Sequence, residues 1–86
     1  MFWVYVLQNR FDKTLYIGYT TNLKRRLEEH KSGRGANITA AKNGWKLIYC
    51  EGYTHKMDAL GREKFLKGGS GRKYLRKQLK YYLENS

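Results

Sequence analysis

Two short apolar runs at the start of the chain limit the possible folds more than any other feature of the sequence. Residues 2–7 (FWVYVL) and 14–19 (TLYIGY) are rich in β-branched and aromatic residues, and the polar residues 8–13 (QNRFDK) separate them. Runs of this kind are typical of β-strands, and a short polar connection between two of them predicts an antiparallel hairpin. Gly18 interrupts the pattern of the second run, so we expect a close turn there.

A helical pattern follows the hairpin at residues 22–31 (NLKRRLEEHK). At about 100° per residue, Leu23 and Leu27 lie about 40° apart and define the buried face, and Arg26 and His30 fall within about 60° of Leu23. We expect the remaining charged residues of this helix to face solvent. Burying a charged group is costly without compensation. Arg26 and His30 therefore either extend along the edge of a core or project into a functional cleft.

A third strand is expected after a long connection. Residues 32–44 combine glycines with small polar residues and predict a loop. Residues 45–53 (WKLIYCEGY) then alternate in the manner of a strand. This alternation places Trp45, Leu47 and Tyr49 on one face.

Two helical patterns, at residues 54–68 and 70–85, complete the chain, and glycines separate them. The resulting order is β-β-α-β-α-α. It predicts an α+β fold in which a small three-stranded antiparallel sheet is flanked by helices. The length of 86 residues suits one such domain, spanning residues 1–86.

The charge of the chain favours a polyanionic partner. Its 18 Lys and Arg residues outnumber its 7 Asp and Glu residues, which gives a net charge of +11. Such an excess points first to nucleic acid and second to an anionic membrane. The membrane interpretation is disfavoured because no exposed apolar helix stripe accompanies the lysines and no apolar run approaches the roughly 20 residues of a membrane span. We therefore expect a nucleic acid partner, DNA first, and no membrane partner.

The single cysteine, Cys50, excludes an internal disulfide and a cysteine-based zinc site. This composition fits a reducing, cytoplasmic setting.

Cations are concentrated on the outer side of the last predicted helix and around the first one. A dense, one-sided charge of this kind is typical of a surface that binds phosphates, although a solvated face has the same pattern. The expected nucleic-acid-binding residues are Lys24, Arg25, Arg34, Arg72, Lys73, Arg76, Lys77 and Lys80.

Among the acidic residues, Glu63 stands out because it lies between Leu60 and the Ala59–Leu66 pair on its predicted helix and so points toward the core. A buried carboxylate must be neutral, paired or bound to a metal ion. An ion pair with Arg26 or a lysine and a metal site both remain open. The strand tyrosines Tyr5 and Tyr16 are likewise compatible with cross-strand packing or with a role in a site.

These residues together resemble the GIY-YIG nuclease domain, in its small stand-alone type, over nearly the whole chain. Tyr16-Ile17-Gly18 reads Tyr-Ile-Gly in full, and Trp3-Val4-Tyr5 stands where the family has Gly-Ile-Tyr. Arg26 and the Glu29-His30 pair follow at the family's positions, and the segment GREKFLKG places the family's glutamate at Glu63. The sequence departs from the family at Trp3, where glycine is usual.

The resemblance implies a metal-dependent endonuclease that hydrolyses phosphodiester bonds in DNA. It implies Mg²⁺ or Mn²⁺ as the cofactor, held by Glu63 and water. Tyr5, with a depressed pKa, would help to deprotonate the attacking water, and Tyr16 would support it or contact the phosphate. Arg26 would stabilise charge on the phosphate. His30 would bind the phosphate or Tyr5, or relay a proton.

The alternative is a DNA- or RNA-binding module on the same fold without catalytic activity. Pure binding would not need Tyr5, Tyr16, Arg26 and Glu63 together, which favours the enzyme.

Overall fold

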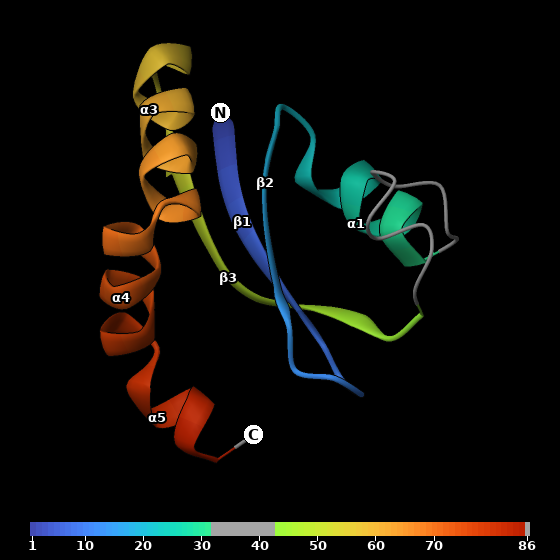
Figure 1. Ribbon diagram of the computed structural model, residues 1–86. Coiled ribbons are helices and arrows are strands. Elements are labelled where there is room, and N and C mark those ends of the chain that lie inside the picture. The colour runs from blue at the N-terminus through green and yellow to red at the C-terminus, as the bar shows by residue number, and fades with distance from the viewer. Residues whose placement is uncertain (32–42, 86) are drawn as a thin grey trace.

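A computed structural model describes residues 1–31 and 43–85. Within that part of the chain, three strands and four helices follow one another as Figure 1 shows. The elements are β1 (Phe2–Asn9), β2 (Leu15–Thr20), α1 (Leu23–Lys31), β3 (Trp45–Tyr53), α3 (Lys56–Lys67), α4 (Gly69–Gln78) and α5 (Lys80–Glu84). The predicted order is confirmed, except that the last predicted helix is divided at Leu79 into α4 and α5. Most of the predicted loop 32–44 lies outside the described residues.

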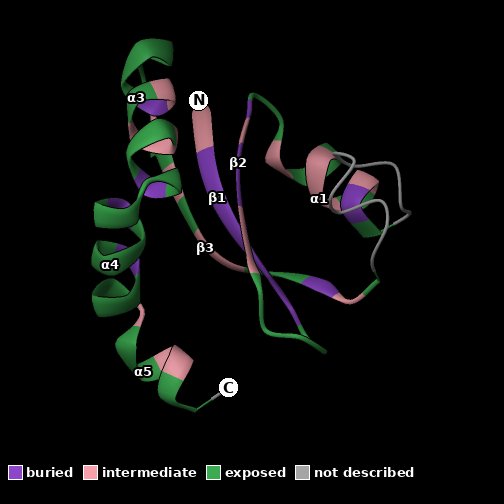
Figure 2. Ribbon diagram, in the orientation of Figure 1, coloured by how far each residue is buried: buried purple, intermediate pink, exposed green. Residues whose placement is uncertain are grey.

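The strands form an antiparallel sheet in the order β2-β1-β3, which confirms the predicted α+β fold. The central strand β1 is buried along most of its length (Figure 2). Val4 and Val6 pack with residues of α3 and α4, whereas Tyr5 and Leu7 pack with residues of α1. Figure 1 shows these helices on opposite sides of the sheet. Alternation along β1 therefore builds two separate cores.

A β-bulge changes which residues of β3 face each core. Val6 is opposite Tyr49, but the next residue of β1, Leu7, is opposite Leu47. The extra residue in β3 reverses the alternation of its side chains. Trp45 consequently packs beside Tyr5 and Leu7, whereas Tyr49 belongs to the core under α3. The expectation that Trp45, Leu47 and Tyr49 share one face is wrong beyond the bulge.

A network of charged and aromatic side chains joins β3 to α3. The Glu51 carboxylate accepts hydrogen bonds from the Tyr49 hydroxyl (2.5 Å) and the Tyr53 hydroxyl (2.8 Å). Both of its oxygens also accept from the Arg62 guanidinium, at 2.9 and 3.1 Å. The guanidinium carbon lies 4.7 Å from the ring centre of Tyr74. This network holds α3 at a fixed rotation on the sheet.

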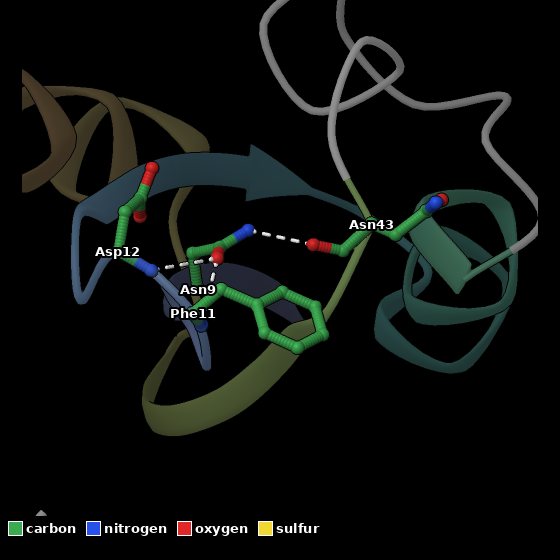
Figure 3. Close-up of a pocket in the computed structure, with 4 residues that line it drawn as sticks. All are labelled: Asn9, Phe11, Asp12 and Asn43. Atoms are coloured by element: carbon green, nitrogen blue, oxygen red, sulfur yellow. Dashed lines mark hydrogen bonds between the residues drawn. The ribbon is translucent and has the colours of Figure 1, made fainter.

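The hairpin turn is organised by a buried asparagine. Asn9 is 2% exposed, and its side-chain oxygen accepts from the backbone N–H groups of Phe11 (3.0 Å) and Asp12 (3.2 Å). Its amide nitrogen donates to the Asn43 carbonyl at 2.8 Å, as Figure 3 shows. One side chain thus fixes the turn and ties it to the residues before β3. Local sequence pattern gives no indication of the second contact because 34 residues separate its partners.

The C-terminal helices are fixed by two contacts. A Cβ atom at Gly71 would lie 1.7 Å from the Phe65 carbonyl oxygen, so only glycine allows α4 to approach α3 this closely. After the bend at Leu79, the Tyr82 hydroxyl donates to the Gln8 side-chain oxygen at 2.6 Å and attaches α5 to the sheet. In the described part of the chain, every helix is too short or too polar to cross a membrane.

Candidate active site

The centre of the candidate site is a hydrogen bond between Tyr5 and His30. The Tyr5 hydroxyl, from β1, lies 2.9 Å from Nε2 of His30, in the last turn of α1. Tyr5 is 1% exposed and His30 is 4% exposed. The position of His30 on the inner side of α1 agrees with the spacing from Leu23 and Leu27, which pack into the same core.

Gly18 makes room for the Tyr5 side chain. The two residues are directly opposite each other in the β1–β2 ladder. A Cβ atom at Gly18 would lie 2.4 Å from the Tyr5 hydroxyl oxygen, so the phenol lies directly across the glycine. The expectation of a turn at Gly18 is wrong, because this residue is inside β2. Gly18 is important because it has no side chain, which leaves space for the Tyr5 phenol.

Two further aromatic rings, those of Tyr16 and Trp45, lie beside the hydrogen-bonded pair. The Tyr16 ring centre lies 6.3 Å from that of Tyr5 and 5.4 Å from that of His30. The Trp45 ring packs edge-on against Tyr16, with the centres 6.3 Å apart. Trp45 was not among the site residues expected from the sequence. The one signal for it was its place as the first apolar residue of the third strand.

Arg26 is held beside the pair by Glu29. The buried Nε atom of Arg26 lies 3.4 Å from a Glu29 carboxylate oxygen, and it makes no hydrogen bond to the residues the structure describes. The Arg26 side chain is 34% exposed and that of Glu29 is 31% exposed. Glu29 is therefore half-buried. The helical pattern had predicted that it faces solvent. The guanidinium is restrained but still accessible to a ligand.

Glu63 approaches the site from α3. Along this helix, Ala59 and Leu66 form the buried line, and at about 100° per residue Glu63 lies about 40° to one side of Ala59 while Arg62 lies about 60° to the other. The Glu63 side chain is 19% exposed and pairs with the Lys67 ammonium at 2.9 Å. This ion pair with a lysine is one of the two arrangements that the sequence left open for Glu63.

Burial sets the protonation of the central pair. It raises the pKa of the Tyr5 phenol above the ordinary 10.0, and the charges of Glu63 and Glu29 act in the same direction, while Arg26 opposes them. Burial also lowers the pKa of His30 below 6.5, and Arg26 adds to this effect. At neutral pH Tyr5 is therefore protonated and His30 is neutral. The hydroxyl can donate to His30 Nε2 when the ring proton is on Nδ1.

The expected depression of the Tyr5 pKa is wrong for the protein by itself. The Arg26 charge does lower this pKa, as a nearby cation should, but desolvation of the phenol is the larger effect. Any proton transfer through Tyr5 must therefore begin from the neutral phenol.

The expected phosphate-binding cations are all exposed where the structure describes them, and Arg34 lies outside the described residues. Lys24 and Arg25 belong to α1. The others, on the opposite side of the sheet in α4 and α5, are Arg72, Lys73, Arg76, Lys77 and Lys80. The structure thus brings Tyr5, Tyr16 and His30 into contact, with Arg26 and Glu63 close enough for their charges to act on Tyr5. It does not bring the α4 cations, as a group, to that centre.

Comparisons with known proteins identify related sequences and a related structure. The sequence pattern of the GIY-YIG catalytic domain matches residues 1–78. A UPF0213 protein of Streptococcus pneumoniae serotype 4 is 48% identical over 65 residues, which are 76% of this chain and 65% of that protein, so the match spans less than two thirds of that relative. A UPF0213 protein of Pediococcus acidilactici is 40% identical over 87 residues, covering 99% of this chain and 83% of the relative. The solution NMR structure of a Bacillus halodurans UPF0213 protein is 34% identical, covers 95% of this chain and 85% of its own, and superimposes with a TM-score of 0.55.

Proposed function

Because the chain belongs to the GIY-YIG catalytic-domain family, we propose that it is a metal-dependent endonuclease that hydrolyses phosphodiester bonds in DNA. The observation that carries this proposal is the Tyr5 hydroxyl. It is held 2.9 Å from His30 Nε2, and the charges of Arg26 and Glu63 act on it. A buried phenol paired with a neutral imidazole beside a restrained guanidinium suits acid–base chemistry on a phosphate.

The Tyr5–His30 pair supports a proton relay. As a water molecule attacks the phosphorus atom, its proton passes to the Tyr5 oxygen, and the Tyr5 proton passes to His30 Nε2. The bond from phosphorus to the leaving oxygen breaks in the same displacement, and that oxygen takes a proton from solvent. Because Tyr5 starts protonated and His30 starts neutral, this route needs no free phenolate.

Arg26 would bind the phosphate that reacts. Its buried Nε atom lacks a hydrogen bond to any described residue, and its partner Glu29 is 3.4 Å away. A phosphate oxygen would satisfy that atom and draw the guanidinium toward the developing negative charge. Tyr16 would pack beside the phosphate and keep the Tyr5 ring in place, since the two ring centres are 6.3 Å apart.

Glu63 would hold the divalent cofactor, Mg²⁺ or Mn²⁺. The described residues contain no group of three or more His, Cys, Asp or Glu side chains suited to a metal, so among them the protein would supply at most two such ligands, Glu63 being one. This fits Mg²⁺, which keeps several waters and binds through one or two carboxylates and a substrate phosphate. The Glu63 carboxylate already attracts the Lys67 ammonium at 2.9 Å, so its position favours positive charge. When bound, such an ion polarises a phosphoryl oxygen or a coordinated water.

The exposed cations would position the nucleic acid through its backbone. Contacts to phosphates carry no sequence information and release counterions on binding. Replacing Lys73 and Lys77 with Gln should weaken binding to unrelated duplexes alike. It should also flatten the plot of log affinity against log salt by up to ~2 units, at about 0.9 per contact. An unchanged slope would leave Lys24 and Arg25 as the described cations to test next.

The decisive experiment is a cleavage assay on single- and double-stranded DNA and RNA with Mg²⁺ or Mn²⁺. Glu63→Gln should lower the rate at saturating substrate on the order of a thousandfold and leave binding largely intact. Glu28→Gln is the matched control, because it removes one negative charge from an exposed position on α1. Normal activity in Glu63→Gln would refute the metal assignment. Binding without cleavage by the parent protein under every condition would favour a non-catalytic binding module.

A further inference from the structure

A hollow of about 380 Å³ lies at the open edge of the sheet, where β2 faces α3 and α4. We call it the β2-edge hollow. Its lining residues are Leu15, Tyr16, Ile17, Lys67 and Arg72. Because Tyr16 also packs against Tyr5 and His30, the hollow borders the candidate active site.

The charged side chains that line the β2-edge hollow are two cations, Lys67 and Arg72. Lys67 is the last residue of α3, and its side chain is 54% exposed although its ammonium lies 2.9 Å from the Glu63 carboxylate. Arg72 projects from the first turns of α4. Its neighbour on that helix, Lys73, is exposed but does not line the hollow. Arg72 therefore differs from Lys73 in that it lines the hollow that borders the candidate active site.

The chemistry of this lining suits one kind of ligand. Two cations beside apolar walls match a phosphodiester, which carries one negative charge and is flanked by sugars. The described side chains that line the hollow include no amide and no carboxylate. Together with arginine, these are the groups that read base edges most specifically. Contact through Tyr16 places this phosphodiester beside the one at the active site.

We propose that the β2-edge hollow holds the phosphodiester adjacent to the one that is cleaved, with Lys67 and Arg72 as its two cationic ligands. This inference rests on the proposed nuclease function. Lys67 is shared between two anions, the Glu63 carboxylate and the bound phosphodiester. A divalent ion at Glu63 weakens the attraction of that carboxylate for the ammonium and leaves Lys67 available to the phosphodiester. Lys67 should therefore strengthen binding when the metal is present, whereas Arg72 should strengthen it with or without the metal.

The test measures binding of a labelled single strand by fluorescence anisotropy in the Tyr5→Phe background, which prevents cleavage while metal is present. With Mg²⁺, Lys67→Gln and Arg72→Gln should each weaken binding about tenfold, as expected for a hydrogen bond to a charged group. With a chelator, only Arg72→Gln should weaken it. The matched control is Lys64→Gln, which removes one positive charge from an exposed position on α3 that does not line the hollow.

A second arm locates the phosphodiester. A neutral methylphosphonate is moved along the strand one position at a time, with Mg²⁺ present. One position should weaken binding about tenfold in the background protein and in Lys64→Gln, but have no further effect in Lys67→Gln or Arg72→Gln, because the same contact is already lost.

The outcomes distinguish a failure of this inference from a failure of the proposed nuclease function. If binding occurs but the Lys67 and Arg72 variants behave like Lys64→Gln, the β2-edge hollow is not a phosphodiester site, and the nuclease proposal stands. If the parent protein binds no nucleic acid with or without metal, both proposals are refuted. Position-specific methylphosphonate sensitivity that disappears in the two variants would support the inference.

Discussion

Two polar clusters lie on opposite faces of the sheet, and both combine tyrosine hydroxyls with an arginine and a glutamate. On the α3 face, the Glu51 carboxylate accepts from two tyrosines and twice from Arg62. On the α1 face, Tyr5 bonds His30, while Arg26 and Glu29 are 3.4 Å apart without a hydrogen bond between them. The same residue types thus form a saturated network on the α3 face, whereas on the α1 face the Arg26 Nε atom makes no hydrogen bond to the described residues.

This difference separates a structural role from a chemical one. A charged pair whose hydrogen-bonding groups are largely satisfied within the protein has little capacity left for a ligand, so the Glu51–Arg62 network serves the packing of α3. The α1-face cluster contains a guanidinium nitrogen that lacks a hydrogen bond to any described residue, a neutral imidazole and a protonated phenol. Perturbed pKa values occur in both clusters, so the pKa of a residue does not by itself identify the site.

The largest effect expected on the α1 face is loss of catalysis without loss of fold. Tyr5→Phe keeps the buried ring but removes the hydroxyl that passes the proton, so the turnover rate should fall about a thousandfold. The melting temperature should fall by only several degrees, because one buried hydrogen bond is lost while the packing of the ring is kept. Single-turnover cleavage and thermal unfolding of the same preparation measure both. Full activity would remove Tyr5 from the mechanism.

On the α3 face we expect the reverse, a loss of stability with activity retained per folded molecule. Arg62→Ala leaves the partly buried Glu51 carboxylate without its cation and should cost about 3 kcal/mol of unfolding free energy. For a chain of this size, that corresponds to a fall of about 10–20 °C in melting temperature. Urea unfolding gives the free energy, and activity is measured well below the midpoint. A stable but inactive variant would show that this network serves the active site directly.

An intermediate effect is expected at Gly18, where packing and chemistry meet. The added methyl group of Gly18→Ala would displace the Tyr5 phenol and its bond to His30, costing about 1–3 kcal/mol of stability and most of the activity. Gly61→Ala is the control, because its Cβ would meet nothing within 4 Å. In the middle of α3, that change should add about 0.5–1 kcal/mol. Equal behaviour of the two variants would contradict the close approach of Tyr5 to Gly18.

The smallest expected effect is a difference in pH dependence. Because the pKa of His30 is lowered by burial, the unfolded chain takes up a proton there as pH falls through about 6.5 while the native protein resists, and stability declines. Hydrogen bonds from Arg62 and the tyrosines outweigh burial and lower the pKa of Glu51. Its contribution is therefore present above about 4.5 and is lost as pH falls through its lower folded value.

Urea unfolding between pH 8 and 3 should resolve these two contributions. His30→Gln should abolish the decline near neutrality, and Glu51→Gln should abolish the acidic one. If His30→Gln keeps the upper decline, another group is responsible for it.

Several features of this protein were determined by its sequence alone. The apolar runs and helical periodicities located the three strands and the order of the helices, because strand and helix signals are local. The spacing of Tyr5, Tyr16, Arg26, His30 and Glu63 identified the family. Helical arithmetic correctly put His30 on the inner side of α1, since its period is fixed by the backbone.

Only the tertiary structure determined the burial and the surroundings of these residues. The bulge in β3, which turns Tyr49 and Glu51 toward α3, depends on pairing with β1 and has no local signature. Gly18 became a support for the Tyr5 phenol rather than a turn, because the opposite strand supplies the ring. The direction of the Tyr5 pKa shift was wrong from sequence, since counting nearby cations ignores desolvation, which depends on everything packed around the phenol. Burial is a property of the whole fold, and for that reason it could not be predicted from the spacing of residues along the chain.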